Sequence, residues 1–315
     1  MINRVLFYNS GGGTGDAIQI LPLIDTLKTK FENAKFFYLC SHENHFNSTL
    51  SDLNCKIKTL NLDVKYFGFR WWHLFLVKKN LSKLKLDQFD VIVDCQSKLR
   101  NTIILKQIPS KAFYSSTFNN IFCSGLELPA EKFWSDLKTI DYDIKNIPKK
   151  YFDESARLLP GKNYIGFSLT LGNVYRKKEW PLNKIIKLSE ELLKNNKIPV
   201  FFIEKKYQEL KNKIKNSIPS ALFPEHETSL DSPALVTCLG TRLDLAITID
   251  NGIMHMLSLS KVPIISLFGP TDAEKFAPQY KDTKVLDSKK IYNSKNVSDI
   301  NVEDVLQAAK QFVSS

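Results

Sequence analysis

Short apolar runs that end in polar or glycine-containing turns recur along the chain. Two of them, 243–249 and 264–268, flank the turn Asp250-Asn251-Gly252 and a mostly apolar segment with helical spacing. A strand, a turn, a helix and a second strand in this order are typical of a parallel β-α-β unit. Further apolar runs predict strands at 4–8, 35–40, 90–95, 111–116, 164–169, 198–203 and 220–223. The pattern therefore predicts an α/β protein.

The regular pattern weakens in one place, between residues 124 and 160, where proline, lysine and aromatic residues are scattered without a clear period. A chain of 315 residues is long enough for two domains with separate cores. We therefore expect domains at 1–150 and 151–315, with a linker near 143–150. The second domain should close with a helix at 297–312, capped by Ser298 or Asn301.

The turn at 250–252 is the first candidate for chemistry. Ligands of open α/β sheets bind outside the carboxyl ends of the strands, where a helix N-terminus attracts phosphate. Gly252 allows a close backbone approach, Asp250 can accept hydrogen bonds from a sugar, and His255 lies within the first helical turn. In the alternative interpretation, Asp250 or Asn251 only caps the helix and His255 is a surface residue.

A second candidate is the glycine-rich loop 9–16, between the first strand and a helix in which Pro22 indicates a kink or a late start. Its residues Gly13, Thr14 and Gly15 resemble a dinucleotide-binding loop, but Asp16 breaks the G-x-G-x-x-G spacing and no G-K-[ST] ending follows. Asp16 is either a general base facing a sugar hydroxyl or a cap of the helix.

A third candidate follows the strand at 164–169. Thr170 begins its edge loop, and Arg176, Lys177 and Lys178 come shortly after it. Consecutive cations beside a strand edge can bind a diphosphate, and the alternative is a solvated charge run. Pro181 then begins an amphipathic helix.

The most aromatic segment, Phe67 to Val77, is followed by Lys78 and Lys79. It is too short to span a membrane. The interpretation that we favour is a helix packed in the core of the first domain. The alternative is an interfacial element that contacts anionic lipid headgroups.

The net charge and the cysteine content limit the possible binding partners and the cellular compartment of the protein. The net charge of +11 comes from lysines spread along the chain and suits nucleotide diphosphates or acidic lipids. We expect no nucleic-acid partner. Five cysteines without a C-x-x-C pair, no signal peptide and no spanning segment predict a cytoplasmic protein. His42-Glu43-Asn44-His45 does not match H-E-x-x-H, so no metal site is expected.

Four motifs in order resemble glycosyltransferase family 9, the bacterial heptosyltransferase-like enzymes of lipopolysaccharide core assembly. Gly15-Asp16 with Pro22 is similar to the family's G-D-x-x-x-x-x-P, and 91–96 is similar to V-I-D-x-Q. The segment 178–181 is similar to K-R-W-P. The stretch 250–255, followed by 267–271, is similar to D-[ST]-G-P-M-H and L-F-G-P-T.

The resemblance implies a GT-B architecture, in which two Rossmann-like doubly wound domains face a cleft. The acceptor, a lipopolysaccharide core or another glycan or lipid-linked molecule, would bind the first domain, and a nucleoside-diphosphate sugar, expected to be ADP-heptose-like, would bind the second. The transfer would be inverting and would need neither metal nor cofactor. Asp16 would be the base, with Gly13, Thr14 and Gly15 as the acceptor-side loop. The donor would be bound by Thr170, Lys178, Asp250, Asn251, Gly252 and His255.

Departures from the motifs leave a second function open. Asn251 replaces Ser or Thr, Ile253 replaces Pro, and Glu179 replaces Arg. These changes motivate the alternative of a nucleotide-sugar-binding protein without transferase activity. The aromatic segment and the basic charge also leave open a peripheral location at the inner membrane.

Overall fold

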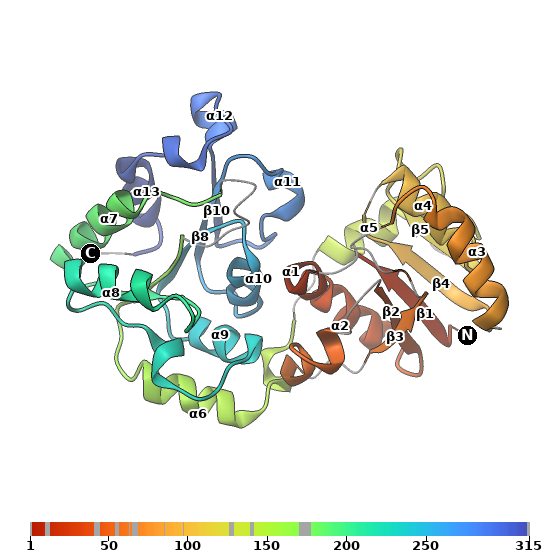
Figure 1. Cartoon of the computed structure of the whole chain (residues 1–315), viewed down its shortest axis with the longest axis horizontal. Coiled ribbons are helices and arrows are strands. Elements are labelled where there is room, and N and C mark those ends of the chain that lie inside the picture. Colours follow the sequence, from red (N-terminus) through yellow and green to blue (C-terminus); the bar gives the residue numbers. More distant parts are fainter. Residues whose placement is uncertain are drawn as a thin grey trace. The chain divides into compact units, whose positions relative to one another are not determined.

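The computed structural model describes residues 2–9, 13–40, 45–53, 57–62, 64, 69–84, 86–96, 98–125, 129–138, 142–169 and 178–313. The chain forms two compact units, Met1–Asp143 and Ile144–Ser315, and each unit is built on its own five-stranded sheet (Figure 1). All pairings within the two sheets are parallel. This is the α/β architecture that the alternation of apolar runs and helical segments predicts.

The sheet of the first unit has the strand order β3-β2-β1-β4-β5. Its strands are β1 Arg4–Tyr8, β2 Lys35–Cys40, β3 Lys58–Asn61, β4 Phe89–Asp94 and β5 Ser110–Ser115. Its helices are α1 Thr14–Ile18, α2 Leu21–Lys30, α3 His73–Leu84, α4 Leu99–Leu105 and α5 Ala130–Lys138. One hydrophobic cluster joins the sheet to α3 and α4 through residues such as Leu6, Val77 and Ile104.

The sheet of the second unit has the order β10-β9-β8-β6-β7. Its strands are β6 Tyr164–Ser168, β7 Ile198–Phe201, β8 Leu245–Ile249, β9 Ile264–Phe268 and β10 Thr283–Asp287. Its helices are α6 Lys149–Leu158, α7 Leu182–Lys194, α8 Gln208–Ser217, α9 Pro233–Gly240, α10 Gly252–Leu259, α11 Ala273–Phe276, α12 Ser288–Tyr292 and α13 Val302–Ala309. The main core lies between the sheet and α7, α8 and α13, whereas α9 packs against α6 and α10 (Figure 1).

Each sheet has a point at which the chain reverses the direction in which it adds strands. In the first sheet this switch point lies between β1 and β4, because β2 and β3 are added on one side and β5 on the other. In the second sheet it lies between β6 and β8. Loops leave the carboxyl ends of the two central strands in opposite directions there, which opens a crevice for ligands. The topology therefore indicates where each unit can hold a site.

Most predicted strands and helices are confirmed, and the differences have simple causes. Pro22 lies in the first turn of α2, so the late helix start is correct. The helices α5 and α6 were not expected: each is only nine or ten residues long and follows directly after a proline, Pro129 or Pro148, so the segment shows no long helical period. The strand expected at 220–223 is wrong: among the described residues it amounts to a single bridge at Leu222, followed by a 3-10 turn. The terminal helix is shorter than predicted, and Asn301 caps it.

The aromatic segment at the start of α3 corrects the favoured prediction of a core helix. Phe69, His73 and Val77 are buried, whereas Trp71, Trp72, Phe75 and Leu76 are 54, 59, 77 and 37% exposed. Residues 67 and 68 of the predicted segment lie outside the described residues. The helix thus packs on the sheet with one face and presents apolar side chains with the other. None of the helices in the described ranges is long and apolar enough to cross a membrane.

Candidate functional site

The switch point of the second sheet is held together by Asn251. This residue follows β8 and is the N-cap of α10, where its Oδ1 accepts a hydrogen bond from the N–H of Met254 at 3.0 Å. Its Nδ2 donates to the hydroxyl of Ser168, the last residue of β6, at 2.8 Å. The capping role that the sequence left open is therefore correct for Asn251. The same amide also ties together the two strands that border the crevice.

Lys178 and Asp250 form a buried ion pair at the same place. Each residue is only 8% exposed. The Lys178 ammonium donates to the Asp250 carboxylate and, at 3.1 Å, to the Asp250 main-chain carbonyl. An ammonium has three donors, so within the described part of the chain these two bonds leave one for a ligand. The structure brings together Lys178 and Asp250, which are far apart in the sequence, and it excludes a solvated charge run for Lys178.

Trp180 anchors the segment that carries Lys178. Its side chain is almost completely buried, and its indole N–H donates to the carbonyl of Ile300 at 3.0 Å. Its main-chain N–H donates to the carbonyl of Leu169 at 3.0 Å. The ammonium two residues earlier is therefore held beside β6. Thr170, Arg176 and Lys177 lie outside the described residues, so their predicted roles stay predictions.

His255 is the fourth residue of α10, within its first turn, and its side chain is buried, so the alternative of a surface histidine is wrong. Its pKa is lowered to about 4, chiefly by burial; the negative charge of Asp250 opposes this shift, and the positive charge of Lys178 adds to it. The imidazole is consequently neutral near pH 7. It can serve the site as a hydrogen-bonding group but not as a cation.

Gly252 is the first residue of α10, and the space around it is open. A Cβ atom built on Gly252 would meet only the Cε of Met256, at 4.0 Å, among the described residues. The first turn of α10 carries no acidic side chain. Free backbone N–H groups at a helix N-terminus attract anions, and a glycine lets them approach closely. The crevice therefore combines a buried cation, a helix N-terminus and room beside it.

The switch point of the first sheet carries Asp16. Gly13 is the N-cap of α1, and Thr14, Gly15 and Asp16 form the first helical turn. Asp16 is therefore not the N-cap residue, but its carboxylate folds back onto the cap: a Cβ atom on Gly13 would lie 3.2 Å from Asp16 Oδ2. The side chain is partly exposed. A negative charge in the first turn is favoured by the helix dipole.

Two amide side chains that the sequence did not single out as site residues hold Asp16 in place. Gln96, just after β4, donates from Nε2 to Asn9 Oδ1 at 2.8 Å. Asn9, just after β1, donates from Nδ2 to the main-chain carbonyl of Asp16 at 2.7 Å. The signal for both was present in the sequence, because each is a polar residue directly after a buried strand.

Below these amides lies a fully buried carboxylate, Asp94. Its oxygens accept from the hydroxyls of Thr102 at 2.6 Å and Ser115 at 2.9 Å and from the N–H of Gln96 at 3.0 Å. Burial and the negative charges of Asp94 and Asp16 raise the pKa of Tyr8, which stays protonated at physiological pH. The Asp94 oxygens accept hydrogen bonds from three donors, and the side chain is inaccessible to solvent. Asp94 therefore stabilises the carboxyl end of the sheet but is not a group that a substrate reaches.

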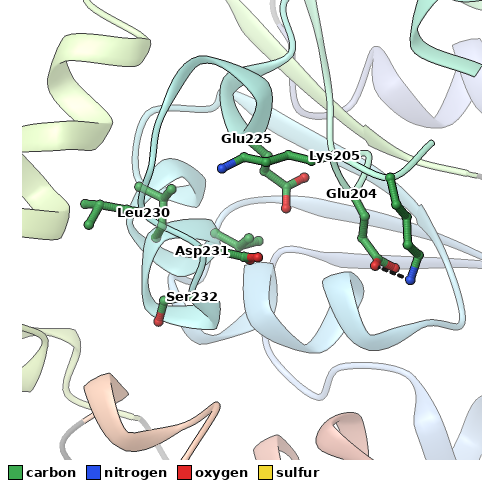
Figure 2. A pocket seen from close by; sticks show the side chains of 9 residues that line it. Glu204, Lys205, Glu225, Leu230, Asp231 and Ser232 are labelled. Atoms are coloured by element: carbon green, nitrogen blue, oxygen red, sulfur yellow. Dashed lines mark ion pairs between the residues drawn. The ribbon is translucent and has the colours of Figure 1, made fainter. Parts of the chain in front are cut away.

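A separate pocket of about 290 Å³ lies at the carboxyl end of β7 in the second unit (Figure 2). It is lined by Glu204, Lys205, Lys206, Glu225, Leu230, Asp231, Ser232, Leu235 and Val236. Glu204 comes shortly after β7, as a polar residue at the carboxyl end of this strand. Within the described ranges, no three histidine, cysteine or acidic side chains are grouped as a metal site would require. His42 of the H-E-N-H segment lies outside those ranges.

Two Rossmann-like units, each with polar side chains at its switch point, define the GT-B class of glycosyltransferase folds. Solved structures with this fold include a family 9 glycosyl transferase from Veillonella parvula, with a TM-score of 0.67 and 17% identity over 98% of this chain and 97% of the other. They also include the E. coli heptosyltransferase WaaC with ADP-2-deoxy-2-fluoro heptose, with a TM-score of 0.63 and 14% identity over 98% of this chain and 100% of the other.

Sequence comparison identifies the family, within the GT-B class, to which the chain belongs. The profile of glycosyltransferase family 9 (heptosyltransferase) matches residues 115–306, more than half of the chain. Lipooligosaccharide heptosyltransferase 2 of Campylobacter jejuni is 23% identical over 270 residues, which are 84% of this chain and 80% of that protein. The chain belongs to glycosyltransferase family 9, and it is a glycosyltransferase.

Proposed function

We propose that this protein transfers a heptose from an ADP-linked donor to a lipopolysaccharide core or related glycan acceptor. The observation that carries the proposal is the buried Lys178–Asp250 pair beside the N-terminus of α10, in a chain of family 9. The name of the Campylobacter relative and the ADP-heptose analogue in the WaaC structure support the choice of sugar and nucleotide. The proposal assigns the acceptor to the first unit and the donor to the second.

On the donor side, the negative charge of the departing diphosphate needs stabilisation. The remaining donor of Lys178 and the N–H groups at the start of α10 would supply it, with Gly252 leaving room for the phosphate oxygens. Asp250 and Asn251 would hold these groups in position, and neutral His255 would contribute a hydrogen bond. We infer that fixed positive charge replaces a metal ion and that no other cofactor takes part. Turnover should then be unchanged by EDTA.

On the acceptor side, Asp16 would act as the general base. The carboxylate would take the proton of the acceptor hydroxyl as its oxygen attacks the anomeric carbon and the bond to the diphosphate breaks. Such a single displacement inverts the anomeric configuration. The partly exposed position of Asp16, in a helical turn fixed by Asn9 and Gln96, supports this role. Gly13, Thr14 and Gly15 would form the wall of the acceptor site.

We also infer that the protein works in the cytoplasm as a peripheral protein on the anionic inner membrane. Exposed Trp71 and Trp72 lie in the turn directly before α3, and α3 itself carries exposed Phe75, Lys78 and Lys79. Aromatic side chains beside lysines suit an interface of anionic headgroups. The fourfold variant W71S/W72S/F75S/L76S should no longer sediment with phosphatidylglycerol vesicles at low salt, whereas Ile291→Ser, which alters an exposed apolar residue of the second unit, should sediment normally. Equal sedimentation of both variants would contradict the inference.

A direct assay of transfer tests the main proposal. Purified protein should release ADP from ADP-heptose only when a core glycan acceptor is present, and the product should have the inverted anomeric configuration by NMR. UDP-, GDP- and CMP-linked sugars serve as matched donors. Release of ADP without acceptor-linked sugar, or transfer from another nucleotide in preference to ADP, would contradict the proposal.

A further inference from the structure

Residues 295–301, which connect α12 to α13, pack against the chain segment that carries Lys178. These residues, called the strap below, include a short 3-10 turn, Val297–Asp299. The side chains of Val297 and Ile300 are buried in the core of the second unit. The strap is therefore a packed element of the unit and not a loose surface loop.

The first part of the strap lies against Gly269, the residue directly after β9. A Cβ atom on Gly269 would lie 2.7 Å from the carbonyl oxygen of Lys295 and 2.7 Å from the main-chain nitrogen of Val297. Backbone atoms cannot be approached this closely by a side chain, so only glycine lets the strap lie here. Because β9 neighbours β8, whose end carries Asp250, the strap is held beside the donor crevice.

The second part of the strap is tied to the Lys178 segment through the carbonyl oxygen of Ile300. This oxygen accepts a hydrogen bond from the indole N–H of Trp180 at 3.0 Å and another from the ammonium of Lys184 at 2.9 Å. A carbonyl oxygen has two lone pairs, so these two donors use both. Since Trp180 is two residues after Lys178, a shift of the strap would move the backbone from which the Lys178 side chain extends.

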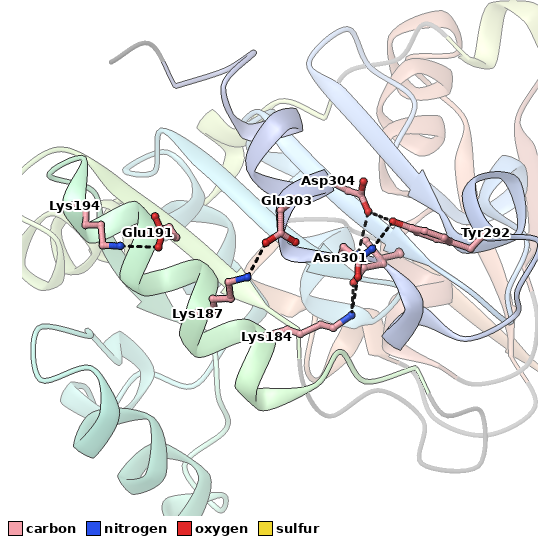
Figure 3. A network of polar contacts seen from close by, with 9 residues as sticks. Lys184, Lys187, Glu191, Lys194, Tyr292, Asn301, Glu303 and Asp304 are labelled. Atoms are coloured by element: carbon pink, nitrogen blue, oxygen red, sulfur yellow. Dashed lines mark hydrogen bonds and ion pairs between the residues drawn. The ribbon is translucent and has the colours of Figure 1, made fainter.

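Lys184 directs all three donors of its ammonium at the strap. Besides the Ile300 carbonyl, it donates to the carbonyl of Ser298 at 2.7 Å and to Asn301 Oδ1 at 3.5 Å (Figure 3). Lys184 is the third residue of α7, where the helix dipole disfavours a cation, and residues 182–185 include no acid that would compensate. The contacts with the strap therefore account for a lysine at an otherwise unfavourable position.

We propose that Lys184 is a positioning residue of the donor site: it fixes the strap, and the strap, through Trp180, holds the ammonium of Lys178 where the diphosphate binds. The proposal rests on the proposed function, because it takes Lys178 to bind the donor phosphates. The flexible stem of a lysine must be held in place before the ligand arrives if its charge is to stabilise the leaving group. Asp250 holds the ammonium itself, and the strap holds the backbone that carries it.

Calorimetric titration of ADP and inorganic pyrophosphate tests the role of Lys184. Lys184→Met keeps an unbranched side chain but removes the three donors, so the affinity for both ligands should fall by about tenfold, as for residues coupled in one hydrogen-bond network. The factor should be equal for both ligands, because Lys178 would contact only their phosphates. The matched control is Lys187→Met, which removes an exposed ion pair between the same helix and Glu303 of α13 and should bind both ligands as wild type does.

Two further variants test whether the effect passes through Trp180. Lys184→Arg offers donors to the same oxygens and should restore ADP affinity to within about threefold of wild type. Trp180→Phe removes the indole N–H and should weaken ADP binding by itself. The double variant Trp180→Phe/Lys184→Met should bind ADP about as weakly as Trp180→Phe, since a strap that no longer contacts Trp180 cannot act on Lys178.

The outcomes separate this inference from the proposed function. Normal ADP and pyrophosphate affinity of Lys184→Met, with a lowered melting temperature, would overturn the inference, because Lys184 would then only stabilise the contact between α7 and α13. An equal loss of affinity in Lys187→Met, or multiplied losses in the double variant, would overturn it as well. No binding of either ligand to the wild type would overturn both proposals. Thermal melting verifies folding, and Lys184→Gln replaces Lys184→Met if the latter is unfolded.

Discussion

The switch points of the two sheets can be compared directly, since both lie at the carboxyl ends of central parallel strands. In the first unit the strands are bridged by uncharged amides, because Gln96 donates to Asn9 and Asn9 donates to the main chain of Asp16. In the second unit Asn251 also bridges two strands, but beside it lies the buried ion pair of Lys178 and Asp250.

The difference between the two edges suggests different chemical tasks. Asp16 is partly exposed, so its carboxylate is able to exchange a proton with a substrate. Lys178 and Asp250 are buried, and their charges are fixed in a region of low dielectric, which suits the proposed stabilisation of a bound diphosphate. The same topology thus positions both sites, while the burial of the charged groups decides what each can do.

The largest expected effect follows from removing the proton acceptor of the first unit. Asp16→Asn keeps the shape and the hydrogen bond that the Asp16 carbonyl accepts, so we expect a normal melting temperature. Turnover should fall by about 10²–10⁴-fold, the usual contribution of a general base. ADP affinity, measured by calorimetry, should be unchanged. The control Asp87→Asn alters an exposed carboxylate that pairs with Arg4 and should retain full turnover. Near-normal turnover of Asp16→Asn would show that Asp16 is not the base.

In the second unit, breaking the ion pair should affect stability as well as binding. Lys178→Ala leaves Asp250 buried without its partner, which costs about 3–5 kcal/mol in the free energy of unfolding. The double variant Lys178→Met/Asp250→Leu should recover most of this stability, since a buried pair can be replaced by apolar residues. It should still fail to bind ADP. Urea denaturation and calorimetry measure the two effects, and ADP binding by the double variant would exclude a donor role for the pair.

A smaller effect concerns His255 and pH. Its pKa is about 4 in the folded protein, against an ordinary value of 6.5. The unfolded chain therefore binds this proton first, and the free energy of unfolding decreases as pH falls from 6.5 to 4. Glu225 acts in the opposite direction, because its pKa is raised to about 7 and its stabilisation is lost as pH rises towards 7.

The contribution of His255 is isolated by comparing wild type with His255→Gln, since Glu225 titrates equally in both. The difference in the free energy of unfolding should change in favour of the variant as pH falls from 6.5 to 4. Parallel pH profiles of the two proteins would mean that the histidine is not held neutral by the fold.

The smallest effect on stability and turnover is expected from an exposed ion pair that connects α7 to α13 in the second unit. Lys187 of α7 pairs with Glu303 of α13 at 2.7 Å, next to a network in which Asn301 and Asp304 contact Tyr292 (Figure 3). Both partners of the ion pair are more than half exposed. Solvent and salt screen such pairs, so Lys187→Ala should leave the urea midpoint and the turnover unchanged within error. A clear loss of stability in Lys187→Ala would contradict the expectation that exposed ion pairs contribute little and that the buried Lys178–Asp250 pair contributes much.

Much of the fold could be predicted from the chain, because buried parallel strands need continuous apolar runs and their helices need amphipathic spacing. The strands around Leu6, Ile92 and Ile247 are recognisable for this reason. The helices α5 and α6 were not, because each is only nine or ten residues long and begins directly after a proline, so no long helical period is visible. The half-exposed face of α3 was also mispredicted, since the same aromatic residues occur in cores and on interaction surfaces.

The sequence by itself determined the strand-turn-helix units, the polar turn that begins α10, and the position of Asp16 after the first strand. These features depend on residues that are close together in the chain. Only the tertiary structure decided that Lys178 is paired with Asp250, that Gln96 reaches Asp16 through Asn9, and that the Oε2 atom of Glu225 is buried without a hydrogen-bond partner among the described residues. Each of these depends on which strands become neighbours, because strand order sets which distant side chains meet and how far water is excluded from them.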